Sequence, residues 1–340
     1  MRTRFILMVL ALLAAIVPAR AKDPTVVTLV QSSLSFNFVP LYVAQTQGYF
    51  TLEGLKVEVV LAGGGPKAMM ALLGGGGQFA AAVLHDGIVA HAKGLNDARA
   101  IAALSYSYNP MVVRTDIAKA RGLNLDRPLA ERVKSMKGLK LAVTSVGGNA
   151  ELMVRFLAIS NGLSPERDFE IVPLGGVASQ IAGLRTGQVD GCSCVLGVDI
   201  LTKQQGLTVD LLKPGELSDL DGTTYGTLYT RASYAKANPE VVRGMARAMV
   251  RATALIADRP DLAGRAARPF FKDIDDAAFD ASWRGYLPYF PKLPLIGRED
   301  FLRQLAFEKS VQPPASFVPV PYDDVVDVSA VIAAMRDFSR

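Results

Sequence analysis

Short β-type runs alternate with helical runs along most of the chain, and this alternation restricts the fold more than any other feature. Residues 26–30, 55–62 and 139–144 are rich in branched apolar side chains, and each run leads through a Gly- or Ser-containing loop into a helical pattern. Parallel strands need such crossover connections, because a chain must return to the same edge of the sheet before the next strand begins. The alternation predicts an α/β fold with largely parallel sheets.

The length of the chain indicates two domains. Its 340 residues exceed the size at which a single hydrophobic core usually stops growing. The alternation occurs twice, then an extended pattern returns at residues 223–231 and a mainly helical part follows. We therefore predict lobe 1 from residues 22–108 plus 226–340 and lobe 2 from residues 109–225. Extended crossings near residues 106–112 and 222–228 would form a hinge. The alternative is two sequential domains joined by one linker.

The N-terminus has the composition of a secretory signal peptide. Arg2 and Arg4 precede an apolar run over residues 5–17, and the order Ala19-Arg20-Ala21 follows. The run is too short to span a bilayer, which takes about 20 apolar residues. We expect residues 1–21 to be a signal peptide that is cleaved after Ala21, which would place the mature protein in the periplasm.

Removing that segment changes the charge. The full chain has 37 basic and 32 acidic residues, and three of the basic residues lie in the signal peptide. The mature chain is therefore close to neutral, and its Lys and Arg residues are not clustered. This distribution argues against nucleic acid as a partner.

Cysteine and histidine are scarce. Cys192 and Cys194 are the only cysteines, and His85 and His91 are the only histidines. Residues i and i+2 of an extended strand lie about 7 Å apart, at the outer limit for a disulfide. We interpret the cysteines as small buried residues or free thiols. The sequence indicates no metal site and no cofactor.

One stretch carries a family resemblance. Residues 38–50 read FVPLYVAQTQGYF and residues 53–58 read EGLKVE, with further matches at 71–73 (ALL), 78–80 (QFA) and 184–191 (LRTGQVDG). This pattern resembles the solute-binding proteins of ABC importers of the nitrate, sulfonate and taurine type. The same superfamily holds the thiamine-pyrimidine-synthesis proteins. The resemblance extends over nearly the whole mature chain.

The resemblance implies a type II periplasmic-binding-protein fold, with two α/β lobes, a central ligand cleft and two hinge crossings. It further implies a monomer that captures a small molecule by lobe closure, passes it to an ABC permease in the inner membrane and does no chemistry on it. The fold class itself places ligands beyond the carboxyl ends of the strands, where helix N-termini offer unpaired N–H groups.

This placement selects the candidate ligand-binding residues. They are hydroxyl, amide, Gly, His, Asp and Tyr residues at strand ends, helix starts and the two crossings, beside Ser32 and Gly175 of the same loops: Ser33, Ser35, Asn37, Gly64, Gly65, His85, Asp86, Tyr108, Thr144, Ser145, Gly147, Gly148, Gly176 and Tyr225. The alternative interpretation is that the glycines only form turns and His85 only caps a helix. Phe36 and Phe38 are expected in the core.

The candidate loops contain no arginine that could clamp an oxyanion, although Arg155 and Arg185 lie on nearby helices. The expected solute is therefore a small organic anion or a weakly charged aromatic or sulfonate-type compound. Two other functions stay open. One is a thiamine-pyrimidine-related protein, suggested by Cys192 and Cys194, and the other is a sensory protein that presents its ligand to a membrane receptor.

Overall fold

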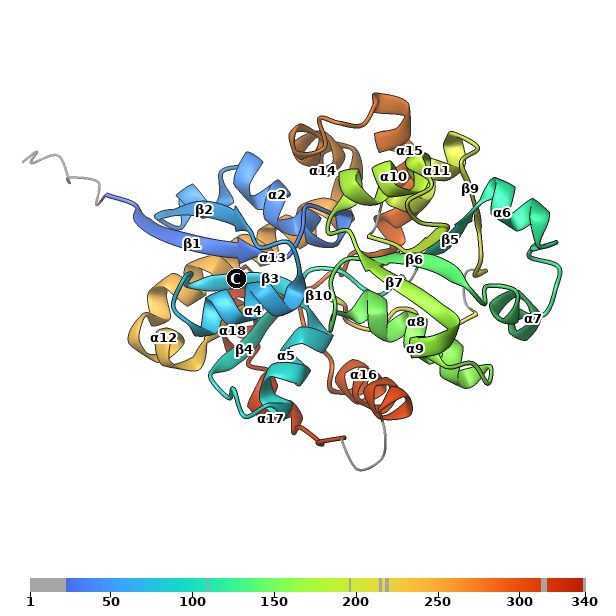
Figure 1. The fold of residues 1–340 in the computed structure, drawn as a ribbon. Coiled ribbons are helices and arrows are strands. Elements are labelled where there is room, and N and C mark those ends of the chain that lie inside the picture. The colour runs from blue at the N-terminus through green and yellow to red at the C-terminus, as the bar shows by residue number, and fades with distance from the viewer. Residues whose placement is uncertain are drawn as a thin grey trace, which may run out of the picture.

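The computed structural model describes residues 23–108, 110–195, 197–213, 216–217, 220–312 and 317–338. Two five-stranded sheets form two lobes that lie side by side (Figure 1). The predicted signal peptide lies outside the described residues. Within the described ranges, no helix is long and apolar enough to cross a membrane.

Lobe 1 is built on the first sheet, in the order β2-β1-β3-β10-β4. Its strands are β1 (Thr25–Gln31), β2 (Leu55–Leu61), β3 (Phe79–Val83), β4 (Ala98–Ala103) and β10 (Gly226–Arg231). The chain leaves this sheet after β4 and returns to it only with β10. Lobe 1 is thus formed by two segments that are far apart in the sequence.

Lobe 2 is built on the second sheet, in the order β7-β6-β8-β5-β9. Its strands are β5 (Met111–Arg114), β6 (Leu139–Val143), β7 (Phe169–Pro173), β8 (Gly191–Ser193) and β9 (Thr208–Asp210). The two sheets have the same arrangement. In each, the strand that enters from a crossing between the lobes is fourth in the order: β10 in the first sheet and β5 in the second.

The prediction of largely parallel sheets is correct for only part of each sheet. β2-β1-β3 and β7-β6-β8 are parallel, but β10 pairs antiparallel with β3 and β4, and β5 pairs antiparallel with β8 and β9. The reason is the crossing itself. A strand that arrives from the other lobe enters at the end of the sheet where the parallel strands finish, so it runs against them.

Helices cover both faces of the first sheet. One face carries η1 (Phe36–Phe38), α2 (Val39–Thr46), α3 (Tyr49–Leu52), α13 (Pro239–Asp258), α14 (Pro260–Ala267) and α18 (Ser329–Phe338). The other face carries α4 (Gly65–Leu73), α5 (Leu84–Ala92) and α17 (Tyr322–Val325). α12 (Ala232–Ala237) follows β10. Phe36 and Phe38 are fully buried, and Phe36 stacks on Phe271 with ring centroids 4.3 Å apart. Their predicted place in the core is confirmed.

The second sheet is covered in the same way. α6 (Thr115–Ala120), α7 (Leu129–Lys134) and α8 (Asn149–Ser160) contribute to one core, which includes Leu141 and Leu157, and α9 (Pro165–Asp168) packs on α8 and β7. α10 (Val177–Thr186) and α11 (Val198–Gln204) cover the opposite face, where Leu184 and Val198 are buried.

The two crossings run side by side and antiparallel. Tyr106 and Thr224 form an isolated antiparallel bridge. The Ser107 N–H donates to Thr223 O at 2.7 Å, and the Tyr225 N–H donates to Ser105 O at 2.8 Å. The two crossings thus connect the lobes as one paired ribbon.

Two C-terminal helices also connect the lobes (Figure 1). α15 (Asp276–Tyr286) packs on α11 of lobe 2, whereas α16 (Arg298–Val311) packs on both α5 of lobe 1 and α8 of lobe 2. The side chains of Phe307 and Val311 on α16 are part of the lobe 2 core. The C-terminal segment therefore spans the interface between the lobes.

Candidate functional site

A small polar pocket lies between the lobes, at the carboxyl ends of four strands. Its volume is about 40 Å³. β1 leads into Ser33, β3 into Asp86, β6 into Ser145 and β8 into Cys194, so the pocket lies where the sheet-edge rule predicts it. The residues that line it come from both lobes: Ser32, Ser33, Asn37, Phe38, Gly65, Val83, Asp86, Thr144, Ser145, Gly148, Asn149, Ala150, Cys194, Val195 and Tyr225.

Hydroxyl and amide groups make up most of the polar surface of this pocket. Asn149 Nδ2 donates to the Tyr225 hydroxyl at 3.3 Å, which joins lobe 2 to the returning crossing. Burial raises the pKa of Tyr225 to about 12, so its hydroxyl stays protonated and is able to donate a hydrogen bond. The Oγ atom of Ser145 is buried and has no hydrogen-bond partner. The Ser145 hydroxyl is thus a donor and an acceptor that no described protein group satisfies.

Asp86 is the only charged side chain that lines the polar pocket in the part of the chain the structure describes. Its Oδ2 accepts from the Val83 N–H at 3.0 Å, within the first turn of α5. A Cβ atom placed on Gly65 would lie 2.0 Å from this carboxylate, so the position admits only glycine without rearrangement. Burial raises the pKa of Asp86 to about 6, although the nearby His85 opposes that increase.

His85 lies behind the pocket, where it joins three segments. Nδ1 lies 2.5 Å from Oε1 of Glu308 on α16, and Nε2 lies 3.2 Å from the carbonyl oxygen of Gly147 in lobe 2. Both side chains are almost fully buried. His85 therefore contacts the opposite lobe rather than the space in which a solute would lie.

A larger cavity adjoins the polar pocket and shares Ser32 and Ser33 with it. We call it the apolar cavity. Its volume is about 430 Å³, within the range of cavities that hold organic ligands. It is lined by lobe 1, by α10 and α11 of lobe 2, and by the segment between α14 and α15. Its larger apolar side chains are Leu34, Leu61, Val177, Ile181, Leu201, Phe270, Phe271 and Ile274.

The structure gathers most of the predicted residues but not all of them. Eight line the polar pocket: Ser33, Asn37, Gly65, Asp86, Thr144, Ser145, Gly148 and Tyr225. Gly176 lines the apolar cavity instead. The other five, Ser35, Gly64, His85, Tyr108 and Gly147, line neither space.

Those five residues have other contacts. The Ser35 N–H donates to the Tyr42 hydroxyl at 3.3 Å, and the ring of Tyr108 packs on Tyr286 and Tyr289. Gly64 lies against Ser145 of lobe 2, with which a Cβ atom would collide at 2.8 Å. The Gly147 carbonyl accepts from His85. Gly64, His85 and Gly147 therefore lie in the contact between the lobes.

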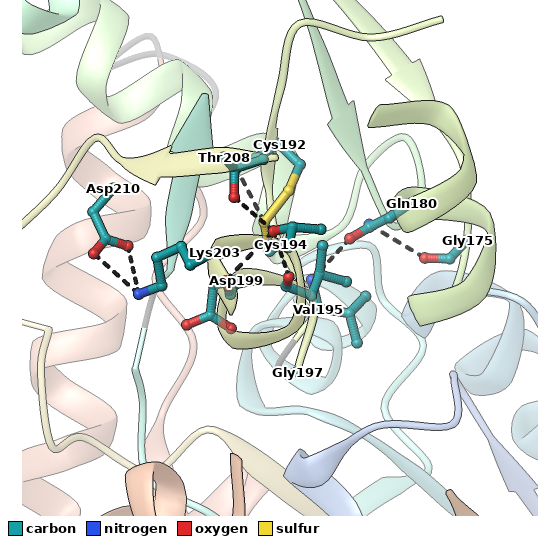
Figure 2. The surroundings of a disulfide bond; sticks show 12 residues. Gly175, Gln180, Cys192, Cys194, Val195, Gly197, Asp199, Lys203, Thr208 and Asp210 are labelled. Carbon is teal, nitrogen blue, oxygen red and sulfur yellow. Dashed lines mark hydrogen bonds and ion pairs between the residues drawn. A yellow bond between two sulfur atoms is a disulfide. The ribbon is translucent and has the colours of Figure 1, made fainter. Parts of the chain in front are cut away.

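The interpretation of the cysteines as free thiols or small buried residues is wrong, because Cys192 and Cys194 form a disulfide. β8 ends at Ser193, so Cys194 leaves the extended path and its Cα lies 5.0 Å from that of Cys192. Figure 2 shows this disulfide beside Gln180, whose Oε1 accepts from the Val195 N–H at 3.0 Å and whose Nε2 donates to Gly175 O at 3.3 Å. These bonds hold the loop that lines the polar pocket.

Basic residues are placed at the edge of the site. Arg185 is exposed at the rim of the apolar cavity and donates to Gln205 at 3.2 Å. Arg155 pairs with Glu151 and Glu166, away from both spaces. Among the described residues, no three His, Cys, Asp or Glu side chains are grouped so as to hold a metal ion.

Several lining residues were not among the predicted ones. Phe270, Phe271 and Ile274 come from the helical C-terminal part, where Phe270 stacks on Tyr42 and Phe271 on Phe36 of lobe 1. Nothing in their local sequence indicates a site. Asn149 could have been found, because it directly follows Gly148 at the start of a predicted helix.

The comparisons with known proteins show the family and the fold. The NMT1/THI5-like family model matches residues 35–263, so the chain belongs to the NMT1/THI5-like family. This confirms the resemblance seen in the sequence. The putative binding protein YtlA of Bacillus subtilis is 24% identical over 312 residues, which cover 89% of this chain and 88% of that protein.

Solved structures show the same fold. A Bordetella bronchiseptica RB50 protein has a TM-score of 0.80 at 22% identity, with 94% of this chain and 99% of that chain covered. The alkanesulfonate-binding protein SsuA of Xanthomonas axonopodis pv. citri, bound to MOPS, has a TM-score of 0.68 at 18% identity, with 91% and 98% covered. The desulfurization enzyme DSZB has a TM-score of 0.62 at 13% identity, with 92% and 99% covered. The chain has the periplasmic-binding-protein fold, which binding proteins and an enzyme share.

Proposed function

We propose that this protein is the exported solute-binding component of an ABC importer. It would hold a small organic solute, an anion or a weakly charged aromatic or sulfonate-type compound, between its lobes. The observation that carries the proposal is the pair of adjoining spaces that share Ser32 and Ser33. Both are lined from lobe 1 and from lobe 2, so a solute bound there contacts both lobes at once. Such a solute favours the closed arrangement by its differential contacts.

The lobes and the compartment are part of the same proposal. Residues 22–108 with 226–340 would form one body and residues 109–225 the other, and they would move about the paired crossings with α16 sliding at the interface that it shares with α8. Export through the N-terminal segment would place the protein in the periplasm, and the disulfide between Cys192 and Cys194 supports an oxidising compartment.

Binding without chemistry is supported by how the reactive groups are used. Cys192 and Cys194 are joined to each other, so neither provides a thiolate. His85 is bonded to Glu308 and Gly147, and His91 to the carbonyl of Ala98. No described histidine is therefore placed to activate a hydroxyl or water in the polar pocket. We propose that the protein is not an enzyme and acts as a monomer with an inner-membrane permease.

A thermal-shift screen of ligand-stripped protein tests this function. The compounds should include nitrate, bicarbonate, alkyl and aryl sulfonates, taurine, aromatic carboxylates, aromatic amides and pyrimidines. A true solute at 100 times its Kd should add about 2.7 kcal/mol to the free energy of unfolding. Turnover of a compound, or stabilisation by none of them, would count against the proposal. Direct binding of the loaded protein to a sensor kinase instead of a permease would favour the sensory alternative.

A further inference from the structure

The structure divides the proposed ligand site into two chemically different parts. The polar pocket has room for a group of a few atoms, whereas the adjoining apolar cavity is about ten times larger. A solute as small as nitrate would fill only the pocket and leave the cavity walls without contacts. Burial of an apolar body against those walls contributes roughly 25 cal/mol per Å². The site therefore fits a molecule with a compact polar head and an apolar body.

The head has to satisfy Asp86. Its Oδ2 accepts from the Val83 N–H, but none of the described residues donates a hydrogen bond to Oδ1. The Asp86 carboxylate lines the pocket, so a bound solute would cover Oδ1, and a carboxylate oxygen covered without a donor is costly. A sulfonate, carboxylate or nitrate head only accepts hydrogen bonds, and it would add a second negative charge beside the first. A head with an N–H or O–H group would instead bond to Asp86.

The same head also needs an acceptor. Gly148, Asn149 and Ala150 bring the N-terminus of the 12-residue helix α8 to the pocket, where the first N–H groups have no intrahelical partners. The Ser145 and Tyr225 hydroxyls are further donors. Pocket walls that accept at Asp86 and donate at α8 match a group with both functions, such as an amide.

The charges around the pocket agree with this choice. Asp86 faces His85 on its own helix and Glu308 on α16. It also faces Tyr225 on the returning crossing and Tyr229 on β10. When His85 is protonated and Glu308 is ionised, these two charges cancel and Asp86 remains. Arg185 lies at the exposed rim of the apolar cavity, where solvent screens its charge. The interior is thus better suited to a neutral or positive head than to an anion.

We infer that the solute of this protein is an amphiphilic compound with an N–H-bearing, amide-type head bound at Asp86 and an aromatic or branched apolar body in the apolar cavity. This inference rests on the proposed function and excludes sulfonates and nitrate from the solutes expected. Phe270, Phe271 and Ile274 would contact the body, and Ser33 would lie where head and body join.

Matched compounds test the inference. Benzamide and benzamidine carry N–H donors, whereas benzoate has nearly the same shape as benzamidine with only acceptors. Isothermal titration of the full mature protein should show benzamide or benzamidine binding at least about tenfold more tightly than benzoate or benzenesulfonate. Acetamide, which lacks the body, should bind at least about tenfold more weakly than benzamide.

The variant Asp86→Asn provides the second arm. An asparagine donates as well as accepts, so the preference for benzamidine over benzoate should shrink by about tenfold. Because Asp86 also caps α5, the Tm of the variant is measured first, and the wild-type series alone decides if the variant does not fold. Tighter binding of benzoate or benzenesulfonate by the wild-type protein would overturn the inference.

The two proposals fail in different ways. If the screened compounds that stabilise the protein carry no N–H or O–H donor on their heads, the inference is overturned while the proposed function stands. If no compound in the screen stabilises the protein, the proposed function falls and the inference falls with it.

Discussion

Nδ1 of His85 lies 2.5 Å from Oε1 of Glu308, and Nε2 of the same ring lies 3.2 Å from the carbonyl oxygen of Gly147. A carboxylate and a carbonyl both accept, so the ring donates at both nitrogens and is protonated. Burial alone would lower the pKa of His85, but the Glu308 carboxylate and the other acceptors outweigh it and raise the pKa to about 9. One imidazolium therefore connects α5 of lobe 1, α16 and the loop of lobe 2.

Replacing His85 by Gln should destabilise the protein, because it leaves the buried Glu308 carboxylate without its charged partner. Removing one member of a buried ion pair costs about 3–5 kcal/mol. Urea unfolding of the single variant and of the double variant with Glu308→Gln measures the effect. The double variant should recover part of the loss, since no unpaired charge remains. Equal losses in both variants would contradict a charge pair.

The same pair predicts a pH dependence. The pKa of His85 is higher in the folded protein than its ordinary value of 6.5. Its contribution to stability is therefore fully present below about pH 6.5 and is lost as the pH rises through about 9. Urea midpoints of the wild-type protein and of the double variant His85→Gln with Glu308→Gln, measured between pH 6 and 10, check this. The wild-type midpoint should fall more steeply, and parallel curves would contradict the assignment.

Gly64 should control lobe closure. A Cβ atom on Gly64 would lie 2.8 Å from the Cβ of Ser145, across the interface between the lobes. Overpacking of this kind costs about 1–3 kcal/mol, so Gly64→Ala should weaken solute binding by roughly 5- to 150-fold. The ligand-free Tm should fall as well, because Gly64 has φ +154°, a backbone conformation that alanine rarely adopts.

Removing the opposing atoms provides the control for Gly64. The change Ser145→Gly, added to Gly64→Ala, takes away both the Cβ and the Oγ that the new methyl group would meet. Because Ser145 also lines the polar pocket, the double variant is compared with Ser145→Gly alone. Calorimetry should show that Gly64→Ala weakens binding less in the Ser145→Gly background than in the wild type. An equal loss in both backgrounds would mean that a steric block is not the cause.

Tyr286 fixes the second contact between the lobes. Its hydroxyl donates to Asp199 on α11 and accepts from the Gly197 N–H at 3.0 Å, and the Asp199 side chain is fully buried. The change Tyr286→Phe leaves both groups unsatisfied, which should cost about 1–3 kcal/mol in urea unfolding. Adding Asp199→Leu removes the buried acid and should restore part of that loss. No difference between wild type and Tyr286→Phe would show that this bond contributes nothing.

The disulfide should leave no cysteine available to a thiol reagent, and it should stabilise the loop beside the polar pocket. Thiol titration of the unfolded, unreduced protein is expected to detect no free thiol, since Cys192 and Cys194 are paired and are the only cysteines. The loop that they close is short, so replacing both by Ser should cost only about 1–2 kcal/mol. Reducing agent should lower the Tm of the wild type and leave that of the double Ser variant unchanged. Two reactive thiols in the native protein would contradict this.

The sheet-forming part of the fold could be predicted because its signals are local. β1, β2 and β6 agree with the predicted runs at residues 26–30, 55–62 and 139–144 to within one residue at each end. The short helices α6 and α7 were not predicted, because six residues contain too few apolar positions to establish a period. The antiparallel entry of β5 and β10 depends on the crossing and not on either strand.

The residues of the site differ in the same way, since some have local sequence signals and others do not. Ser33, Asp86 and Ser145 directly follow strands, so the sheet-edge rule finds them. Phe270 and Ile274 reach the cleft through helix packing between distant segments, and no local pattern reports such contacts. The disulfide was missed because Cys194 lies just beyond the end of β8, and a one-residue difference in a strand end decides whether the bond is possible.

The crystal structure of the mature protein with the compound that stabilises it most tests the central claim directly. The proposal predicts that this compound occupies the polar pocket and the apolar cavity together and contacts Ser33 of lobe 1 and Ser145 of lobe 2 in the same molecule. A compound bound on the surface of one lobe, with both spaces free of it, would contradict the proposal.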